Sequence, residues 1–275
     1  MIPAGAIPRH PVILTVAASD SGGGAGIQAD LKTITVLGGF GISVLTALTA
    51  QNGAEVRGIH AVPEEFVGLQ LQTVRDGFPI RAAKTGMLYS AGIMETLARN
   101  LAGKNFPLVA DPVCVSQSGC RLLREDAVEA LIRHILPLAL CLTPNRHEAE
   151  LLSGQSISGL ADVGRAAALL LDRGAQAVLI KGGHFSEYDT EQTITDWLAL
   201  PGRPLLSLPH PRLDTAHNHG TGCTLSAAAA FFLGQGHSLE DSIRLAQGYL
   251  MRALAAGYAP GVGAGSPDFL AGGES

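Results

Sequence analysis

Short apolar runs alternate with helical patterns along almost the whole chain, and this alternation constrains the fold more than any other feature. Strands are expected at residues 12–18, 42–48, 82–85, 108–110, 139–143, 177–180 and 205–208. Helices are expected at residues 26–37, 64–76, 91–102, 125–135, 146–152, 162–172, 222–233 and 239–256. Near-continuous apolar strands that alternate with helices predict an α/β fold, in which helices cover both faces of a central, mostly parallel sheet.

No linker, low-complexity run or internal repeat divides the chain, so residues 1–275 are expected to form a single domain. The first ~10 residues and the Gly-rich tail after residue ~260 are expected to be irregular. Hydrophobic residues make up 47% of the chain and charged residues 16%, which excludes a disordered protein. The formal net charge of -5 disfavours nucleic acid or an anionic membrane as the main partner.

Cysteine usage and the chain start indicate a cytoplasmic protein. No CxxC pair occurs among Cys114, Cys120, Cys141 and Cys223, and the first residues lack a cationic-then-apolar signal pattern. The longest nearly apolar stretch, residues 223–233, is shorter than the ~20 residues that a membrane span needs.

The segment Ala18–Gly26 directly follows the first expected strand and carries three consecutive glycines. Ligands bind beyond the carboxyl ends of strands in such sheets, and glycine lets the backbone approach a bound molecule. The segment has neither GK[ST] nor GxGxxG, so a flexible strand-to-helix turn is the alternative. Asp20 and Asp30 favour binding, because carboxylates accept hydrogen bonds from a small polar ring.

Two later strand ends carry residues suited to magnesium. Asp111 follows the expected strand 108–110, where a carboxylate suits Mg²⁺ held through water, and a turn-capping aspartate before Pro112 is the alternative. Asn145 and Glu148 lie three residues apart at a helix start and therefore share one face. A capping box has the same spacing, so metal binding and helix capping both remain open.

The segment His217–Ser226 places Gly-Thr-Gly at the start of a strongly apolar helix. Free N–H groups at a buried helix start bind anions, and a phosphoryl group in transfer develops charge on its oxygens. Cys223 lies in the first turn, where the helix dipole favours a thiolate that accepts a proton from a substrate hydroxyl. Close packing of the helix on the sheet is the alternative use of these glycines.

Two further features are less specific. His217 and His219 resemble a metal-binding pair, but the sequence offers no convincing third ligand, which favours loop histidines. Lys181 follows another expected strand and precedes two glycines, which suits contact with a nucleotide phosphate. A solvated turn is the alternative there.

Together these segments resemble the ribokinase-like superfamily, and more closely its hydroxymethylpyrimidine/phosphomethylpyrimidine kinases of thiamine biosynthesis. The resemblance spans residues 12–256, and its most specific stretches are residues 19–33, 46–52, 84–88, 142–152, 181–184 and 219–228. It implies a three-layer αβα sandwich in which ATP and a pyrimidine meet near the start of the Gly220–Cys223 helix. It also implies a Mg²⁺ requirement, a small-molecule substrate and a homodimer.

The resemblance further implies a role for each site residue. The pyrimidine pocket would be formed by Ala18, Ala25, Asp30, Gln51, Met87 and Val115. The magnesium–ATP complex would be served, partly through water, by Asp111, Asn145, Glu148 and Lys181. The anion hole and the base would be supplied by Gly220, Thr221, Gly222 and Cys223. Within the pocket, Gln51 would hydrogen-bond the ring.

The chain departs from the family pattern at a few positions, and other functions remain open. Ala18 replaces the usual glycine, Asn218 replaces the usual threonine, and Gln117 replaces a lysine, which predicts weaker handling of a monophosphate. The alternatives are a pyridoxal kinase, a regulator that binds nucleotide without turnover, and a hydrolase with a cysteine nucleophile. The GTGC segment and the Asn145/Glu148 pair argue against the regulator.

Overall fold

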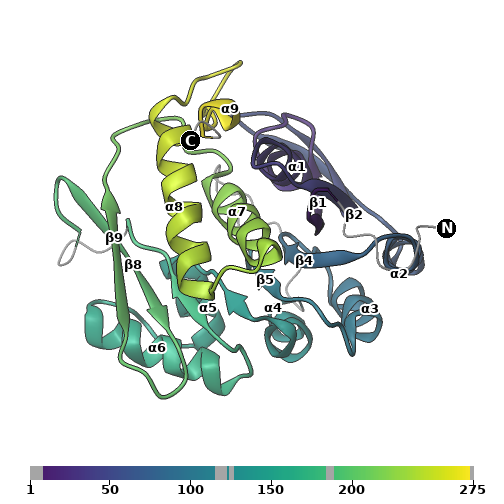
Figure 1. The fold of residues 1–275 in the computed structure, drawn as a ribbon, viewed down its shortest axis with the longest axis horizontal. Coiled ribbons are helices and arrows are strands. Elements are labelled where there is room, and N and C mark those ends of the chain that lie inside the picture. Colours follow the sequence, from purple (N-terminus) through teal and green to yellow (C-terminus); the bar gives the residue numbers. More distant parts are fainter. Residues whose placement is uncertain (1–8, 115–122, 124–126, 184–188, 273–275) are drawn as a thin grey trace.

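The computed structural model describes residues 9–114, 123, 127–183 and 189–272. Its strands form one nine-stranded sheet in the order β3-β2-β1-β4-β5-β6-β7-β8-β9 (Figure 1). The strands are β1 (Val12–Asp20), β2 (Phe40–Gln51), β3 (Val56–Ala61), β4 (Ile80–Thr85), β5 (Leu108–Ala110), β6 (Cys141–Leu142), β7 (Val178–Ile180), β8 (Thr193–Ala199) and β9 (Leu206–Pro211). From β2 to β7 all neighbours pair in parallel, whereas β3, β8 and β9 are antiparallel additions.

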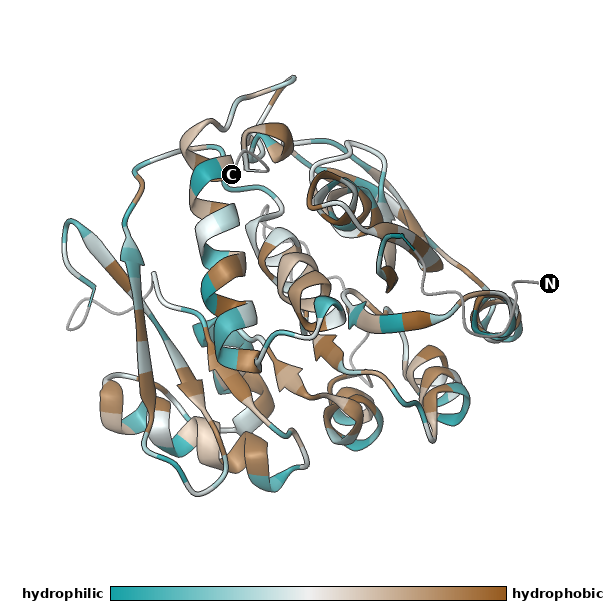
Figure 2. Cartoon of the chain, in the orientation of Figure 1, coloured by the Kyte–Doolittle hydropathy of each residue, from teal (hydrophilic) through white to brown (hydrophobic). Residues whose placement is uncertain are grey.

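Helices cover both faces of this sheet, which confirms the three-layer α/β architecture. They are α1 (Gly26–Val36), α2 (Glu64–Gly77), α3 (Ala91–Leu101), α4 (Ala127–Ala130), α5 (Arg146–Ser153), α6 (Leu160–Asp172), α7 (Thr221–Gln235), α8 (Leu239–Ala255) and α9 (Phe269–Gly272). One apolar core joins the sheet to α2 through α6, and a second joins the opposite face to α1, α7 and α8. The central strands are hydrophobic, and the helices present hydrophilic stretches outward (Figure 2).

Strand β1 shows how the sequence produces the two cores. Successive side chains of a strand point to opposite faces. Leu14 and Val16 accordingly enter the first core and Ile13 enters the second, and all three are fully buried. A strand with apolar residues on both faces is stable only where helices cover both faces, so the unbroken apolar run predicts this central position.

The strand order reverses direction beside β1. The chain proceeds from β1 to β2 and β3 on one side and then crosses to β4 on the other side. Such a switch point leaves a crevice at the carboxyl ends of the two central strands, because the loops that leave them diverge. The Gly-rich loop after β1 and the turn after β4 border this crevice.

The predicted elements agree with most of the observed ones. Ser90 and Ser238 cap α3 and α8, accepting hydrogen bonds from the N–H groups of Ile93 and Asp241. Strands β3 and β8 were not predicted. The helix expected at residues 125–135 is described from Ala127 and continues as a π-helical turn at Leu131–Ile135.

The tail after residue 260 is more ordered than expected. Gly263 bridges to Gly53, Ser266 bridges to Tyr258, and α9 follows.

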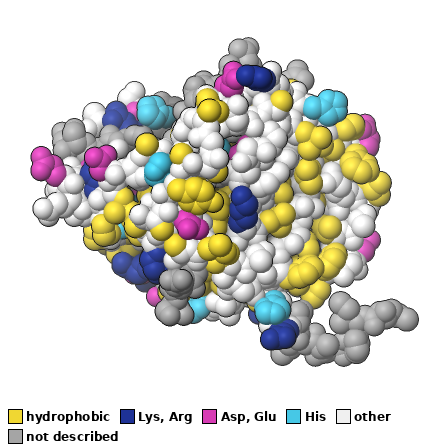
Figure 3. All heavy atoms as spheres, turned by 90° about the horizontal axis from the view of Figure 1, so that it is seen from above, with side chains coloured by type: hydrophobic (Ala, Val, Ile, Leu, Met, Phe, Trp, Pro, Cys, Tyr) yellow, Lys and Arg dark blue, Asp and Glu magenta, His cyan; other side chains and the backbone are white. Residues whose placement is uncertain are grey.

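Strand β9 lies at the edge of the sheet opposite β3 and contains Pro209 and Pro211. No helix in the described parts of the chain is long and apolar enough to cross a membrane. On the face seen in Figure 3, Lys and Arg side chains are scattered among acidic and apolar ones.

Candidate active site

A cavity of about 1020 Å³ lies at the carboxyl ends of the central strands. Five consecutive parallel strands of the sheet each place a residue in its wall. From β1 to β7 in sheet order these residues are Ala18, Met87, Asp111, Asn145 and Lys181. The start of α7 completes the wall, so one space is bordered by strand ends and a helix N-terminus.

Most of the predicted site residues meet in this cavity. It is lined by Ala18, Ala25, Gln51, Met87, Asp111, Asn145, Glu148, Lys181, Gly220, Thr221, Gly222 and Cys223. Val115 lies outside the described residues. Asp30 is not among the residues that line the cavity. The roles assigned to these residues remain predictions, but their convergence means that one bound molecule can contact many of them.

The helix start at Gly220 depends on glycine. Gly220 caps α7 with φ +85, and a Cβ there would overlap the carbonyl oxygen of Gly24. The N–H of Thr221 donates to the Asn218 carbonyl oxygen at 3.3 Å, so this amide already has a partner. A Cβ on Gly222 would lie 3.3 Å from Lys181 Nζ. Glycine therefore lets the backbone of the first helical turn approach the charged side chains of the cavity.

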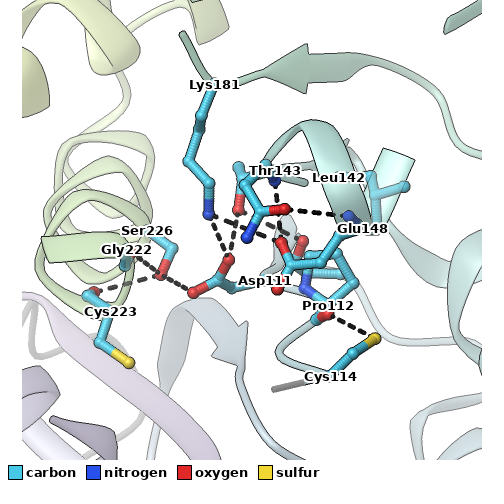
Figure 4. Close-up of polar contacts among 12 residues, drawn as sticks. Asp111, Pro112, Cys114, Leu142, Thr143, Glu148, Lys181, Gly222, Cys223 and Ser226 are labelled. Carbon is cyan, nitrogen blue, oxygen red and sulfur yellow. Dashed lines mark hydrogen bonds and ion pairs between the residues drawn. The ribbon is translucent and has the colours of Figure 1, made fainter. Parts of the chain in front are cut away.

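Asp111 is the centre of a charged network beside this helix start (Figure 4). Its carboxylate accepts from Lys181 Nζ at 3.0 Å, from Thr143 Oγ1 at 3.2 Å and from Ser226 Oγ at 3.5 Å. The residue is only 2% exposed. Burial lowers the pKa of Lys181, but the Asp111 and Glu148 carboxylates outweigh it and raise that pKa, so Lys181 is cationic. A cation and a carboxylate thus lie at the cavity wall beside the first turn of α7.

Asn145 and Glu148 form the capping box of α5. The Asn145 Oδ1 accepts from the Glu148 N–H at 2.9 Å, and the Glu148 Oε2 accepts from the Asn145 N–H at 2.8 Å. Both residues also line the cavity. Capping is therefore present, and it holds the carboxamide and the carboxylate at the wall.

The Glu148 carboxyl has a strongly perturbed pKa. Burial raises this pKa, and the negative charge of Asp111 adds to the effect. The Lys181 cation and backbone hydrogen bonds act in the opposite direction, and the resulting pKa is about 7. Lys181 Nζ lies 4.0 Å from Glu148 Oε2. Near neutral pH this carboxyl is therefore ready to lose its proton to solvent when a cation arrives.

The oxygen donors fit magnesium bound together with a nucleotide. No group of three or more His, Cys, Asp or Glu side chains in the described parts of the chain forms a metal cage. Mg²⁺ usually keeps several waters and binds one or two carboxylates plus substrate phosphates. Asp111 and Glu148 supply two carboxylates on one wall, and Asn145 adds an amide oxygen. This set suits the water-mediated binding that the sequence predicts.

Cys223 is buried at the cavity wall, 9% exposed. Burial raises the pKa of its thiol to about 11, and the charges of Asp30 and Asp111 add to this, although Lys84 and the Gly26 N–H lower it. In Figure 4 the thiol lies below Asp111, on the side away from Lys181. The helix dipole was predicted to favour the Cys223 thiolate, but desolvation is the larger effect in the unliganded protein and favours the thiol.

Asp30 does not line the cavity, which corrects the prediction that it helps to enclose a ring. Its carboxylate is fully buried and accepts from Lys84 Nζ at 2.9 Å and from Thr15 Oγ1 at 2.5 Å. Thr15 and Lys84 are paired across β1 and β4, so their side chains reach the same face, which α1 covers. Asp30 therefore lies outside the cavity, in the buried interface between α1 and strands β1 and β4.

Lys84, the buried partner of Asp30, was missed. Its side chain is 0% exposed, and the Asp30 carboxylate outweighs the effect of burial and raises the Lys84 pKa. The only signal in the sequence was a lysine near the end of an expected strand, in the stretch 84–88 that drew attention for Met87.

One end of the cavity is suited to a small ring. Ala18 and Met87 form an apolar cluster with Ala47, and Val113 packs against it. Gln51 lies at the rim, where its Oε1 accepts from a threonine hydroxyl at 3.2 Å. An apolar surface with one amide at its edge offers stacking area and directional hydrogen bonds.

A second apolar part of the cavity wall comes from elements that sequence analysis did not assign to the site. It is lined by Leu213 and by three residues of α8, Leu250, Met251 and Leu254. These residues carry no chemistry of their own, so no motif pointed to them. Only the packing of α8 beside α7 brings them to the cavity.

The family model described as phosphomethylpyrimidine kinase matches residues 20–268. The hydroxymethylpyrimidine/phosphomethylpyrimidine kinase of Streptomyces coelicolor is 46% identical over 258 residues, which cover 94% of each chain. The thiamine biosynthesis bifunctional protein ThiED of Geobacter sulfurreducens is 45% identical over 248 residues, which cover 90% of this chain and 49% of that protein.

Solved structures show the same fold. The pyridoxal kinase of Staphylococcus aureus in complex with AMP-PCP and pyridoxal has a TM-score of 0.85 and 32% identity, covering 96% of this chain and 95% of the other. The phosphomethylpyrimidine kinase of Clostridium difficile has a TM-score of 0.77 and 37% identity, covering 88% of this chain and 99% of the other.

Proposed function

The chain belongs to the phosphomethylpyrimidine kinase family, and we propose that it phosphorylates 4-amino-5-hydroxymethyl-2-methylpyrimidine with ATP, and then phosphorylates the monophosphate, in thiamine biosynthesis. One observation supports this most strongly. The start of α7 opens into the same cavity as Asp111 and Lys181, and a Cβ on Gly222 would lie 3.4 Å from Asp111 Oδ2. A phosphate and an alcohol can therefore meet at free amides beside a fixed cation.

The nucleotide occupies the half of the cavity next to Lys181. The apolar surface of Leu213 and α8 takes the base, and Lys181 contacts a phosphate. Asp111 and Glu148, with Asn145, would hold Mg²⁺ through water, and the bound ion would neutralise phosphate charge. The amides of Gly222 and Cys223 stabilise the charge on the phosphoryl oxygens.

The pyrimidine occupies the half of the cavity lined by Ala18, Met87 and Gln51. Gln51 hydrogen-bonds the ring, and Ala25 helps to enclose it. The substrate hydroxyl oxygen forms a bond to the γ-phosphorus, while the bond from that phosphorus to the β,γ-bridging oxygen breaks and ADP leaves. The hydroxyl proton passes to the Cys223 sulfur, which must be a thiolate at that moment. The thiolate is a minor form near neutral pH because the thiol pKa is about 11.

Steady-state ATP consumption tests the proposal. We expect turnover with hydroxymethylpyrimidine and with its monophosphate, and the Asp111→Asn variant should lose most of it. Removing one preorganised contact to developing charge typically costs about 3 kcal/mol, or roughly a hundredfold in rate. ATP binding without turnover of either pyrimidine would instead support the regulator.

A pyridoxal kinase is the second candidate. The specific observation in its favour is the TM-score of 0.85 to the Staphylococcus aureus pyridoxal kinase, against 0.77 to the Clostridium difficile phosphomethylpyrimidine kinase. Pyridoxal in the same assay separates the two. A higher kcat/KM for pyridoxal than for hydroxymethylpyrimidine would reverse the assignment. We further propose a cytoplasmic homodimer on the basis of the family resemblance.

A further inference from the structure

The Gly-rich loop after β1 and the segment before α7 form one interlocked unit. The two segments lie 199 residues apart in sequence, and His219 Nε2 donates to Asp20 Oδ2 at 2.9 Å. Both side chains are buried, at 3% exposure for Asp20 and 9% for His219. A buried carboxylate is costly to desolvate unless hydrogen bonds satisfy it, so this buried hydrogen bond calls for a structural or functional reason.

Asp20 holds the loop as well as the histidine. Its Oδ1 accepts from the Gly22 N–H at 2.8 Å, and its Oδ2 accepts from the N–H groups of Gly24 and Ala25 at 3.1 and 2.9 Å. Burial raises the Asp20 pKa, but hydrogen bonds from His219 and the backbone outweigh it and lower that pKa, so the carboxylate is ionised. One side chain therefore fixes the backbone of the loop.

The Gly-rich loop after β1 and the segment before α7 pack so closely that neither can move independently. A Cβ on Gly24 would lie 2.5 Å from His219 Cδ2, and a Cβ on Gly220 would overlap the Gly24 carbonyl oxygen. Gly220 directly follows His219 and begins α7. A displacement of the histidine ring would consequently shift the helix start.

Gly265 and Ser266, which precede α9, pack against both His219 and the Gly-rich loop. The His219 N–H donates to the Gly265 carbonyl oxygen at 3.0 Å, and Ser266 Cβ would lie 3.4 Å from a Cβ on Gly24. The chain there is anchored to Tyr258 through two backbone hydrogen bonds of 3.1 and 3.0 Å. His219 is thus held on its backbone side and on its ring side.

We propose that His219 and Asp20 are positioning residues that fix the α7 amides relative to the substrate wall formed by Ala18 and Ala25. This inference deepens the proposed function and rests on it. Neither side chain needs to touch the transferred phosphoryl group. Their role is to keep two halves of the cavity, which come from distant parts of the chain, in one geometry.

The expected effect follows from the geometry of transfer. Reacting atoms must lie about 3–3.5 Å apart, and a misplacement of ~1 Å costs roughly a hundredfold in rate. Loss of the pair should lower kcat by 10- to 100-fold and raise KM for the pyrimidine. Affinity for ATP should change little, because Lys181 and Asp111 lie on other strands.

Three variants isolate the hydrogen bond. His219→Leu removes the donor, whereas His219→Gln places an amide N–H near the position of Nε2 and should restore at least half of the wild-type kcat. His237→Leu is the matched control, since His237 is exposed just beyond the far end of α7. Wild-type kcat and KM in His219→Leu, or equal defects in the leucine and glutamine variants, would overturn the proposal.

A second measurement does not depend on turnover. Hydrogen–deuterium exchange should accelerate together in peptides covering residues 20–26 and 218–224 in His219→Leu, but not in His219→Gln or His237→Leu. If His219→Leu fails to fold, Asp20→Asn takes its place and must show the same paired acceleration. Unchanged exchange in both peptides would refute the link. If the wild-type protein showed no kinase activity but exchange still accelerated in both peptides of His219→Leu, the proposed function would be contradicted and the structural link between the two segments would stand.

Discussion

Binding of magnesium–ATP should release a proton from Glu148. The carboxyl is about half protonated at pH 7, because burial and the nearby Asp111 charge raise its pKa to about 7. A cation bound nearby favours the carboxylate, so its arrival lowers that pKa. The structure therefore predicts a release of about half a proton at pH 7, about nine-tenths at pH 6 and about one-tenth at pH 8.

Isothermal titration calorimetry measures this release. The Mg²⁺ complex of a non-hydrolysable ATP analogue is titrated at each pH in two buffers that differ in ionisation enthalpy, and the difference in observed heat gives the number of protons. Glu148→Gln is the matched control, because glutamine preserves the capping box and removes only the titrating group. The difference between the two proteins reports Glu148, since the ligand and all other groups are shared.

The sign of the effect makes the test decisive. Only the protonated fraction of Glu148 can release a proton when the cation binds. That fraction decreases as the pH rises from 6 to 8, so the number of protons released must decrease as well. The same titration with the analogue and a magnesium chelator should show no such release. Equal proton release by wild-type protein and Glu148→Gln at pH 6 and 7 would refute the reasoning.

The remaining predictions concern the base, the magnesium site and the buried ion pair. Cys223→Ala should lower kcat about a hundredfold and leave ATP affinity by calorimetry unchanged; near-wild-type kcat would exclude Cys223 as the base. Asn145→Ala should shift the magnesium dependence of steady-state rates to higher concentration, and an unchanged titration would leave Asn145 with capping alone. Lys84→Met should lower the free energy of unfolding in urea by about 3–5 kcal/mol, because it leaves the Asp30 carboxylate buried without its cation. The double variant Lys84→Met with Asp30→Asn should recover part of that loss, and an equal or larger loss would contradict the pairing.

Local patterns were sufficient to predict the parallel part of the sheet. Its strands are mostly apolar runs, and β5, β6 and β7 are followed by Asp111, Asn145 and Lys181, which line the cavity. Strand β3 was missed because Arg57, Gly58 and His60 are exposed and give it no apolar face. Strand β8 was missed because its first residues, Thr193 and Thr195, read as the end of a polar loop.

Contacts between distant segments limited the prediction of the site. Lys84 and Asp30 are 54 residues apart, and Asp20 and His219 are 199 apart, so no local spacing reveals either pair. Asp30 was therefore assigned to the cavity although it lies behind the wall. The balance at Cys223 between the helix dipole and desolvation likewise depends on how the first turn of α7 packs, which a local sequence pattern does not give.

The two prolines of β9 affect how this sheet can associate. The Arg212 N–H donates to the Gln192 carbonyl oxygen, on the β8 side of β9. Backbone groups alternate in direction along a strand, so the backbone nitrogens of Pro209 and Pro211 point away from β8, toward the open edge. Proline has no N–H, and the outer margin therefore lacks two of the donors that an added strand would need. Pairing of β9 with a strand from another copy of the chain is therefore disfavoured. The opposite edge strand, β3, contains no proline and keeps its backbone N–H donors.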